Sequence, residues 1–261
     1  MSFYLDPAFF VLVAIAAVPG IVLGVRERPI RHYGLVVSLV FIVALFSRDL
    51  SGLAYFGVFL AISCAATALT LRWFKRGHKH RVAKYRIALL FVLAPLLCTK
   101  ISAVFDTNLL GFLGVSYLTF KAVQVLIEIR DGIITEMKPL DYLYFLMFFP
   151  VFTTGPIMRS RQFVEDVHRV LPKDEYLGNL YKGLGWFIVG AVYKFLFAAL
   201  AYWFMWFVPS TLATTGFEGF LAQLLYAFGY GLYLFFDFAG YSHMAMGVGF
   251  VLGVRVPSNF H

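Results

Sequence analysis

Four polar side chains near the end of the sequence, Asp237, Tyr241, Ser242 and His243, are of the types that carry out acid–base or hydrogen-bonding chemistry. Asp237 is isolated, because residues 219–236 before it carry no charge. A charged group in such surroundings is costly, and within a membrane it usually faces the protein interior or a water-filled cavity. Asp237 and Tyr241 are four residues apart and share one face if a helix continues through them. Two interpretations stay open: a polar cluster that packs helices together, or the wall of a substrate cavity.

The composition indicates the class of protein. Hydrophobic residues make up 61% and charged residues 14% of the 261 residues, whereas soluble domains average about half and about a quarter. Only helices or closed barrels span a bilayer, and the long uninterrupted apolar runs here are typical of helices. The net charge is +8, and most Lys and Arg residues lie between these apolar runs. This distribution favours an anionic membrane over nucleic acid as the partner. We predict an all-α, polytopic integral membrane protein with a single membrane domain, 1–261.

The apolar runs predict about seven to eight transmembrane helices in a cell membrane. No basic segment precedes the first run, so we expect it to remain in the mature protein. Seven basic residues and no acidic residue fall within 72–86, which is typical of a cytoplasmic loop and places the N-terminus outside. The predicted spans are 8–25, 33–47, 52–71, 87–105, 108–127, 183–208, 217–236 and 238–254.

A shorter apolar stretch, 142–157, lies between charged segments and contains Pro150 and a Thr-Thr-Gly-Pro sequence that begins at Thr153. It is too short to cross a bilayer, so we predict a re-entrant or interfacial segment. Non-helical backbone at that depth is tolerated where it is buried in protein or lines a cavity. Thr153 and Thr154, followed by Arg159, therefore form a second candidate wall.

Two lysines lie within predicted spans and need partners. Lys194 is near the middle of its span, and Asp237 on the next span is the obvious candidate partner. Lys121, Gln124 and Glu128 share one helical face. That face either reaches the inner headgroups or turns toward the cavity.

Three groups of motifs follow one another along the chain: Leu-Gly-Val-Ser-Tyr-Leu-Thr-Phe at 113–120 with Glu-Ile-Arg-Asp-Gly at 128–132, Phe-Phe-Pro at 148–150 with Thr-Gly-Pro-Ile at 154–157 and Arg-Ser-Arg-Gln-Phe at 159–163, and Phe-Asp-Phe-Ala-Gly-Tyr-Ser at 236–242 with Pro-Ser-Asn-Phe at 257–260. Together they resemble the membrane-bound O-acyltransferases (MBOAT). The resemblance covers nearly the whole chain. Within the family it is greatest to the members that serve D-alanylation of teichoic acids in cell wall biogenesis.

The resemblance implies a reaction and its partners. A cytoplasmic acyl carrier protein would present D-alanine as a thioester on its phosphopantetheine arm. The acyl group would pass through a tunnel to a hydroxyl of lipoteichoic acid on the outer side, with a histidine of the family as general base. This chain itself is expected to bind no cofactor and no metal. An alginate-type polysaccharide O-acetyltransferase shares the Asp-Phe-x-Gly-Tyr-Ser element and is the nearest alternative.

In the family the chain continues past Asn-Phe through an Arg-Trp-His and a Trp-His-Gly segment, and the latter carries the histidine associated with catalysis. Because neither segment is present, we expect this sequence to be the N-terminal part of such a protein, and the catalytic residue is unknown. His261 is not in the position of that histidine, and His243 is a candidate substitute base, although a single histidine beside a polar cluster is more often structural. A non-catalytic truncated scaffold and a solute-binding membrane protein are further alternatives. The candidate substrate- or tunnel-lining residues are Asp237, Tyr241, Ser242, His243, Thr153, Thr154, Arg159, Lys194 and Asn259.

Overall fold

The computed structural model describes residues 4, 6–77, 79–210, 212 and 215–259. Within this part of the chain every regular element is a helix, as the composition predicts. The elements are α1 (Pro7–Val25), α2 (Arg31–Leu45), α3 (Leu50–Lys75), α4 (Arg81–Ala103), α5 (Val115–Arg130), α6 (Pro139–Met147), a 3₁₀ turn (Phe149–Val151), α7 (Ser160–His168), α8 (Lys173–Val192), a π-helical segment (Tyr193–Phe197), α9 (Ala198–Ser210) and α10 (Gly216–Val251).

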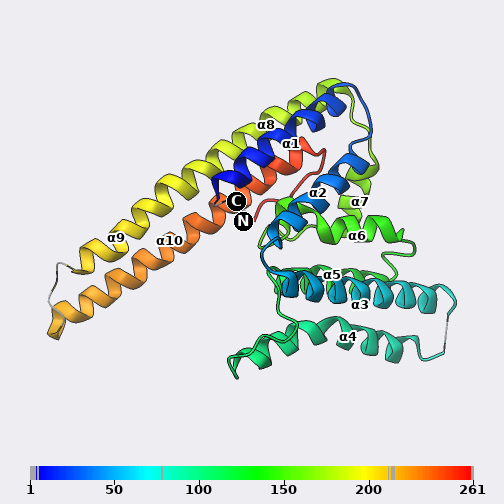
Figure 1. Cartoon of the computed structure of the whole chain (residues 1–261), viewed down its shortest axis with the longest axis horizontal. Helices are drawn as coiled ribbons and strands as arrows, with labels where there is room; N and C mark the ends of the chain where they lie inside the picture. The colour runs from blue at the N-terminus through cyan, green and yellow to red at the C-terminus, as the bar shows by residue number, and fades with distance from the viewer. Residues whose placement is uncertain (1–3, 5, 78, 211, 213–214, 260–261) are drawn as a thin grey trace.

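These helices form two groups. In Figure 1, α8 and α9 run on from one another and lie antiparallel to α10, which makes a long hairpin with α1 beside its inner end. Helices α3, α4 and α5 form a separate stack on the other side of the molecule. The short helices α2, α6 and α7 lie between the two groups, with the 3₁₀ turn packed against both α2 and α10.

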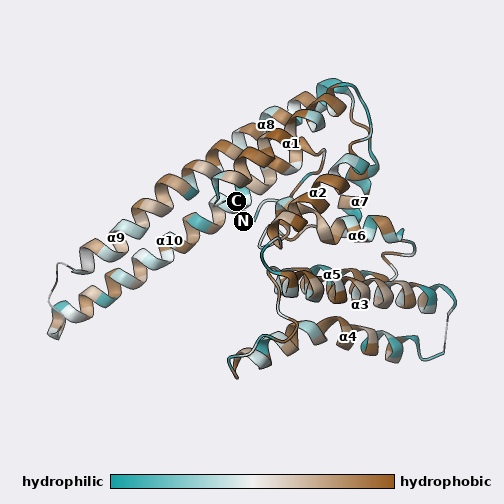
Figure 2. Cartoon of the chain, viewed as in Figure 1, coloured by the Kyte–Doolittle hydropathy of each residue, from teal (hydrophilic) through white to brown (hydrophobic). Residues whose placement is uncertain are grey.

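Among the described residues, five helices are long and apolar enough to cross a membrane: Pro7–Val25, Leu50–Lys75, Arg81–Ala103, Lys173–Phe207 and Gly216–Val251. Figure 2 shows their predominantly apolar residues, with polar residues gathered near the helix ends. Helices α2 and α5 have 15 and 16 residues, fewer than the roughly 20 that a crossing needs. The prediction of seven to eight spans is therefore not confirmed.

The last two predicted spans, 217–236 and 238–254, are one helix. Helix α10 has 36 residues, which corresponds to about 54 Å and exceeds the hydrocarbon thickness of about 30 Å. Gly240 does not break the helix. A Cβ at Gly240 would lie 2.7 Å from the backbone N of Lys194 and 2.8 Å from the carbonyl oxygen of Gly190, so this glycine allows two helix backbones to pack closely.

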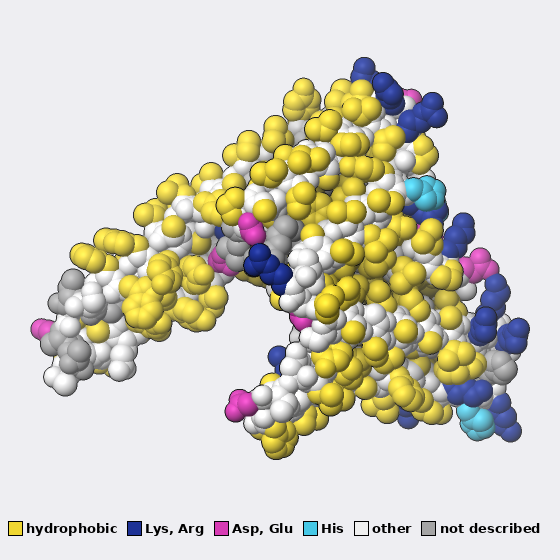
Figure 3. Space-filling model, in the orientation of Figure 1, with side chains coloured by type: hydrophobic (Ala, Val, Ile, Leu, Met, Phe, Trp, Pro, Cys, Tyr) yellow, Lys and Arg dark blue, Asp and Glu magenta, His cyan; other side chains and the backbone are white. Residues whose placement is uncertain are grey.

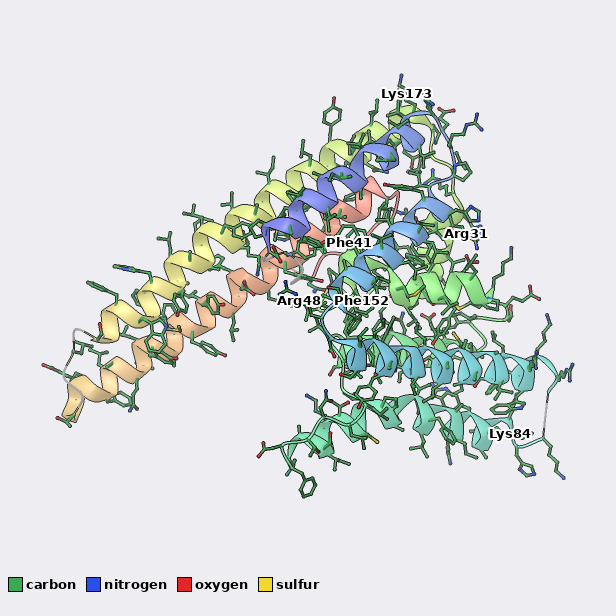
Figure 4. The ribbon with its side chains drawn as sticks, viewed as in Figure 1. Arg31, Phe41, Arg48, Lys84, Phe152 and Lys173 are labelled. Atoms are coloured by element: carbon green, nitrogen blue, oxygen red, sulfur yellow. The ribbon has the colours of Figure 1, made fainter. Side chains whose placement is uncertain are left out.

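Aromatic residues fill the centre of the molecule, around the 3₁₀ turn. Phe41 of α2 stacks on Phe149 with ring centroids 4.1 Å apart, and Phe152 contacts Phe56 of α3 at 5.4 Å. Figure 4 labels Phe41 and Phe152 near this centre. All four side chains are buried. The predicted re-entrant segment is thus a short helix followed by a turn that is buried in protein.

Basic residues gather along one edge of the molecule. Figure 3 shows Lys and Arg along the right-hand edge, while the surfaces of the helices are mainly apolar. In Figure 4 the labelled Arg31, Lys84 and Lys173 lie toward this edge, and Arg48 lies on the other side of α2. The loop at 26–31 and the basic loop at 72–86 therefore lie on the same side of the helices, as their shared charge predicts.

Candidate functional site

The hydroxyl of Tyr241 joins α10 to the turn after α6. It lies 3.2 Å from the carbonyl oxygen of Pro150 and 3.0 Å from Oγ1 of Thr153. A phenol has a single proton, so when Tyr241 donates to Pro150 it accepts from Thr153. The two walls that the sequence predicts, one around Tyr241 and one around Thr153, are therefore in direct contact.

A second phenol reaches the same carbonyl oxygen. The hydroxyl of Tyr4 lies 3.3 Å from the Pro150 oxygen, and its ring packs edge-on against Tyr241 with centroids 4.7 Å apart. Tyr4 is fully buried. Sequence reasoning missed Tyr4, because a lone tyrosine ahead of the first apolar run carries no signal of a contact some 150 residues away.

Helix α5 holds the turn at both ends. Lys121 is fully buried, and its ammonium donates to the carbonyl oxygens of Phe145 and Leu146 in the last turn of α6. The ring of Phe145 lies 4.4 Å from the ammonium. One turn earlier on α5, the hydroxyl of Tyr117 donates to the carbonyl oxygen of Pro156 at 2.5 Å. The Lys121 side chain therefore turns into the protein.

The predicted ion pair between Lys194 and Asp237 is present. The Lys194 side chain is 5% exposed and that of Asp237 is 38% exposed. Lys194 belongs to the π-helical segment, and such segments are frequent at functional sites. The pair lies one helical turn from Tyr241 along α10, so α10 presents an acid and a phenol in succession.

Ser242 and His243 are buried on α10. The imidazole of His243 lies between the rings of Trp186 and Tyr193, with centroid distances of 4.9 Å and 5.4 Å. Its closest ring contacts are therefore with the α8 side of the hairpin, whereas Tyr241 faces the turn. The hydroxyl oxygen of Ser242 is buried without a hydrogen-bond partner among the described residues.

Three other candidates are exposed in the described chain: Thr154, Arg159 and Asn259. Arg159 precedes the first residue of α7. Thr154 nevertheless interacts with the Tyr241 hydroxyl, and His261 lies outside the described residues. A role for any of the nine candidates in lining a tunnel stays a prediction.

Ion pairs tie the basic edge together. Asp141 is buried and lies 2.6 Å from Arg31 and 2.9 Å from His168. Asp166 accepts from the backbone N–H of Arg255 at 2.8 Å and from its guanidinium at 2.6 Å. These hydrogen bonds raise the pKa of Arg255. The side chain of His168 is 37% exposed and connects α7 to Asp141 of α6.

A groove of about 970 Å³ opens at this edge between the end of α3, the loop before α6, and α7. Four basic and three acidic residues lie along it, so its charge is mixed with a small positive excess. Among the described residues no group of three or more His, Cys, Asp or Glu side chains is arranged to hold a metal ion. The charged residues along the groove are Arg72, Lys75, Glu136, Lys138, Asp141, Arg161 and Glu165.

Comparison with known proteins identifies the family. The profile of the MBOAT, membrane-bound O-acyltransferase family, matches residues 56–260. The chain is 35% identical to a teichoic acid D-alanyltransferase of Bacillus subtilis (strain 168), over 100% of this chain and 67% of that protein. It is 34% identical to a teichoic acid D-alanyltransferase of Lacticaseibacillus rhamnosus, over 99% of this chain and 66% of that protein.

A more distant similarity covers part of the chain. A probable alginate O-acetylase AlgI of Pseudomonas aeruginosa is 30% identical over 59% of this chain and 29% of that protein. The chain spans about two thirds of the length of the two D-alanyltransferases. The family profile and these identities agree with the order of the motifs, and the chain belongs to the membrane-bound O-acyltransferase family.

Proposed function

We propose that this chain is the N-terminal part of a membrane O-acyltransferase that moves D-alanine toward teichoic acid hydroxyls. The observation that carries the proposal is the contact between two family motifs, in which Tyr241 bonds to Pro150 and Thr153. The motifs are 91 and 88 residues apart in sequence at these contacts. The identity of 35% to a named teichoic acid D-alanyltransferase supports the choice of D-alanine over other acyl groups.

The reaction transfers an acyl group from a thioester donor to a hydroxyl acceptor. The D-alanyl group arrives as a thioester on the phosphopantetheine arm of a carrier protein. The carbonyl carbon loses its bond to sulfur and gains a bond to the acceptor oxygen, the thiol leaves, and the hydroxyl proton passes to a base. The base is the family histidine, in a segment that this sequence does not contain. Residues of this chain line the path, with Tyr241 and Thr153 at one level of α10 and Asp237 with Lys194 one helical turn away.

The basic edge is the cytoplasmic side, and the carrier docks there. Lys and Arg are enriched in cytoplasmic loops, and the loops at 26–31 and 72–86 lie on this edge. The groove that contains Arg72, Lys138 and Arg161 matches an acidic partner. A photo-crosslinker at position 138 should capture the carrier protein, whereas the same group at Arg48 should not. Failure to capture it from any position within 128–176 would contradict this docking.

An alginate-type O-acetyltransferase is the second candidate. Its support is the similarity to the alginate O-acetylase, which covers 59% of this chain. The two candidates differ in the acyl group that appears on the polymer, so one measurement of ester composition separates them.

The deciding experiment fuses this chain to the C-terminal third of the Bacillus subtilis relative and expresses it in a strain lacking that relative's gene. We expect alkali-labile D-alanine esters to return to the cell wall with the fusion but not with this chain alone. Acetyl esters in place of D-alanine would favour the second candidate. A fusion that inserts into the membrane but restores no ester would contradict both. A Tyr241→Phe fusion should restore less ester than a Tyr181→Phe fusion, which changes a tyrosine that is 76% exposed.

A further inference from the structure

An apolar groove of about 410 Å³ runs between α1, α8 and α10, and its lining also includes Val37 of α2 and Phe149 of the 3₁₀ turn. Its lining contains no charged residue and includes Ala17 and Ile21 of α1, Leu184 and Phe187 of α8, and Val251 of α10. All three helices belong to the segments able to cross a membrane. The groove therefore lies where hydrocarbon surrounds the protein, and its lining and size suit an alkyl chain.

Basic side chains lie past one end of the groove. Arg26 and Arg28 follow Ile21 on α1 by five and seven residues, and five residues correspond to about 8 Å along a helix. The backbone N–H of Lys173 donates to the carboxylate of Glu27 at 2.8 Å, which brings the start of α8 to the end of α1. Figure 4 labels Lys173 at this end, and Figure 3 shows Lys and Arg gathered there.

Two acidic residues at this end are ion-paired: Glu175 with Arg169 at 2.8 Å and Asp166 with Arg255. Glu27 accepts from the neutral Lys173 amide and keeps its charge, and Asp174 is exposed, so these two acids offset part of the positive charge. The charges of Arg26, Arg28 and Lys173 are thus balanced only in part, which suits a phosphate.

We propose that the groove binds one acyl chain of an anionic phospholipid, whose phosphate lies against Arg26, Arg28 and Lys173. The apolar lining contacts the acyl chain of the phospholipid, and the basic side chains contact its phosphate. A neutral lipid has the chain without the net charge, and a free phosphate ester has the charge without the chain. This site is separate from the acyl-transfer function proposed above.

The test begins with the purified chain in detergent, stripped of lipid and titrated with lipid while binding is followed by native mass spectrometry. Phosphatidylglycerol should bind at least tenfold more tightly than phosphatidylcholine with the same acyl chains. Glycerol 1-phosphate should not bind at the same concentrations. Equal affinity for the two lipids, or binding of glycerol 1-phosphate as tight as that of phosphatidylglycerol, would overturn the proposal.

Two variants separate the headgroup from the chain. Arg26→Gln with Arg28→Gln should weaken phosphatidylglycerol binding by roughly 25-fold, about fivefold for each charge, and should weaken phosphatidylcholine binding by a smaller factor, because the choline cation offsets the phosphate of that lipid. Arg76→Gln with Lys79→Gln removes the same charge from a distant loop and should have no effect. Ala17→Phe fills the groove and should weaken both lipids, whereas Val18→Phe, at a position 61% exposed on the same helix, should weaken neither.

A measurement on the unmodified chain keeps the proposal testable if a variant does not fold. Phosphatidylglycerol with a photoreactive group on one acyl chain should label peptides of α1, α8 and α10. Labelling spread evenly over α3 and α4 would contradict the site.

Discussion

The stack around α5 and the hairpin of α8–α10 each contain a buried lysine, and the two regions stabilise it differently. Lys121 is fully buried and donates to carbonyl oxygens in the last turn of α6. Lys194 is 5% exposed and pairs with Asp237, whose side chain is 38% exposed. One ammonium is therefore balanced by backbone dipoles and the other by a carboxylate that is itself partly exposed.

The difference shows what each region can tolerate. The position of Lys121 depends on the backbone of α6, so any change in that backbone alters the surroundings of the charge and, through the turn, the contact at Pro150. The Lys194–Asp237 pair depends on side chains alone, and a matched apolar pair can replace it. The first arrangement fixes a turn in place, and the second holds two helices together at a point next to Tyr241.

The largest effect should come from closing the space between the hairpin backbones. Gly240→Leu places a side chain where a Cβ already lies 2.7 Å from the Lys194 backbone, so the two helices must move apart. We expect a loss of about 3 kcal/mol or more in the free energy of unfolding. The measurement is unfolding in detergent followed by circular dichroism.

Gly231→Leu is the matched control for this change, because a Cβ at Gly231 meets nothing within 4 Å in the same helix. It should leave the unfolding midpoint nearly unchanged. Leucine has a higher helix propensity than glycine, so equal losses from the two substitutions would mean that close packing at Gly240 is not the source of the effect.

Lys121→Met tests the balance by backbone dipoles. It leaves the carbonyl oxygens of Phe145 and Leu146 without their buried donor, and we expect the free energy of unfolding to fall by about 2 kcal/mol. Lys121→Arg should lose less, since a donor remains. Among the described residues Lys121 has no carboxylate partner, so the loss of stability from Lys121→Met should add to that from Asp237→Asn. A double variant whose loss differs from the sum would contradict the conclusion that the two lysines are stabilised independently.

Asp237→Asn tests the ion pair. It leaves the nearly buried ammonium of Lys194 without its carboxylate partner. We expect the free energy of unfolding to fall by about 1–2 kcal/mol, which is less than for a fully buried pair because Asp237 is partly exposed. Lys194→Met combined with Asp237→Leu should recover most of the loss. A double variant as unstable as the sum of the single variants would show that the pair is not the source of the effect.

Tyr241→Phe removes the hydrogen bonds to Pro150 and Thr153 while keeping the ring. We expect a loss of about 1 kcal/mol in stability. In the fusion protein the same change should lower D-alanine ester by a larger factor than its effect on protein abundance. A loss of ester that only follows abundance would assign Tyr241 a structural role.

The smallest effect should come from the exposed pair of Lys75 and Glu136. The hydrogen bond from Lys75 holds the pKa of Glu136 below its usual range, so the pair contributes above the pKa of an unfolded glutamate, about 4.3, and is lost as pH falls below it. Both side chains are exposed, and Glu136→Gln should leave the unfolding midpoint unchanged at pH 7. A clear decrease would mean that the groove at the basic edge supports the fold.

Several features follow from the sequence because their causes are local or compositional. The uninterrupted apolar runs predict helices, and the five membrane-capable segments overlap the predicted runs. The partnership of Lys194 and Asp237 was also predictable, since a lysine within a span needs a partner and the other acid on the neighbouring segment, Glu218, lies at its far end. The motifs around Pro150 and Tyr241 were sufficient to identify the family.

Other features depend on tertiary contacts. The sequence alone does not show that 217–236 and 238–254 are one helix, because a glycine at 240 is equally consistent with a break and with close packing. The positions of Gly190 and Lys194 opposite Gly240 show that this glycine allows close packing within a continuous helix. Likewise, Tyr4, Tyr241 and Pro150 meet across 91 to 146 residues of chain, and no local pattern specifies such a contact. Composition and periodicity determined that this chain is a helical membrane protein, and the packing of backbone against backbone decided which polar groups meet within it.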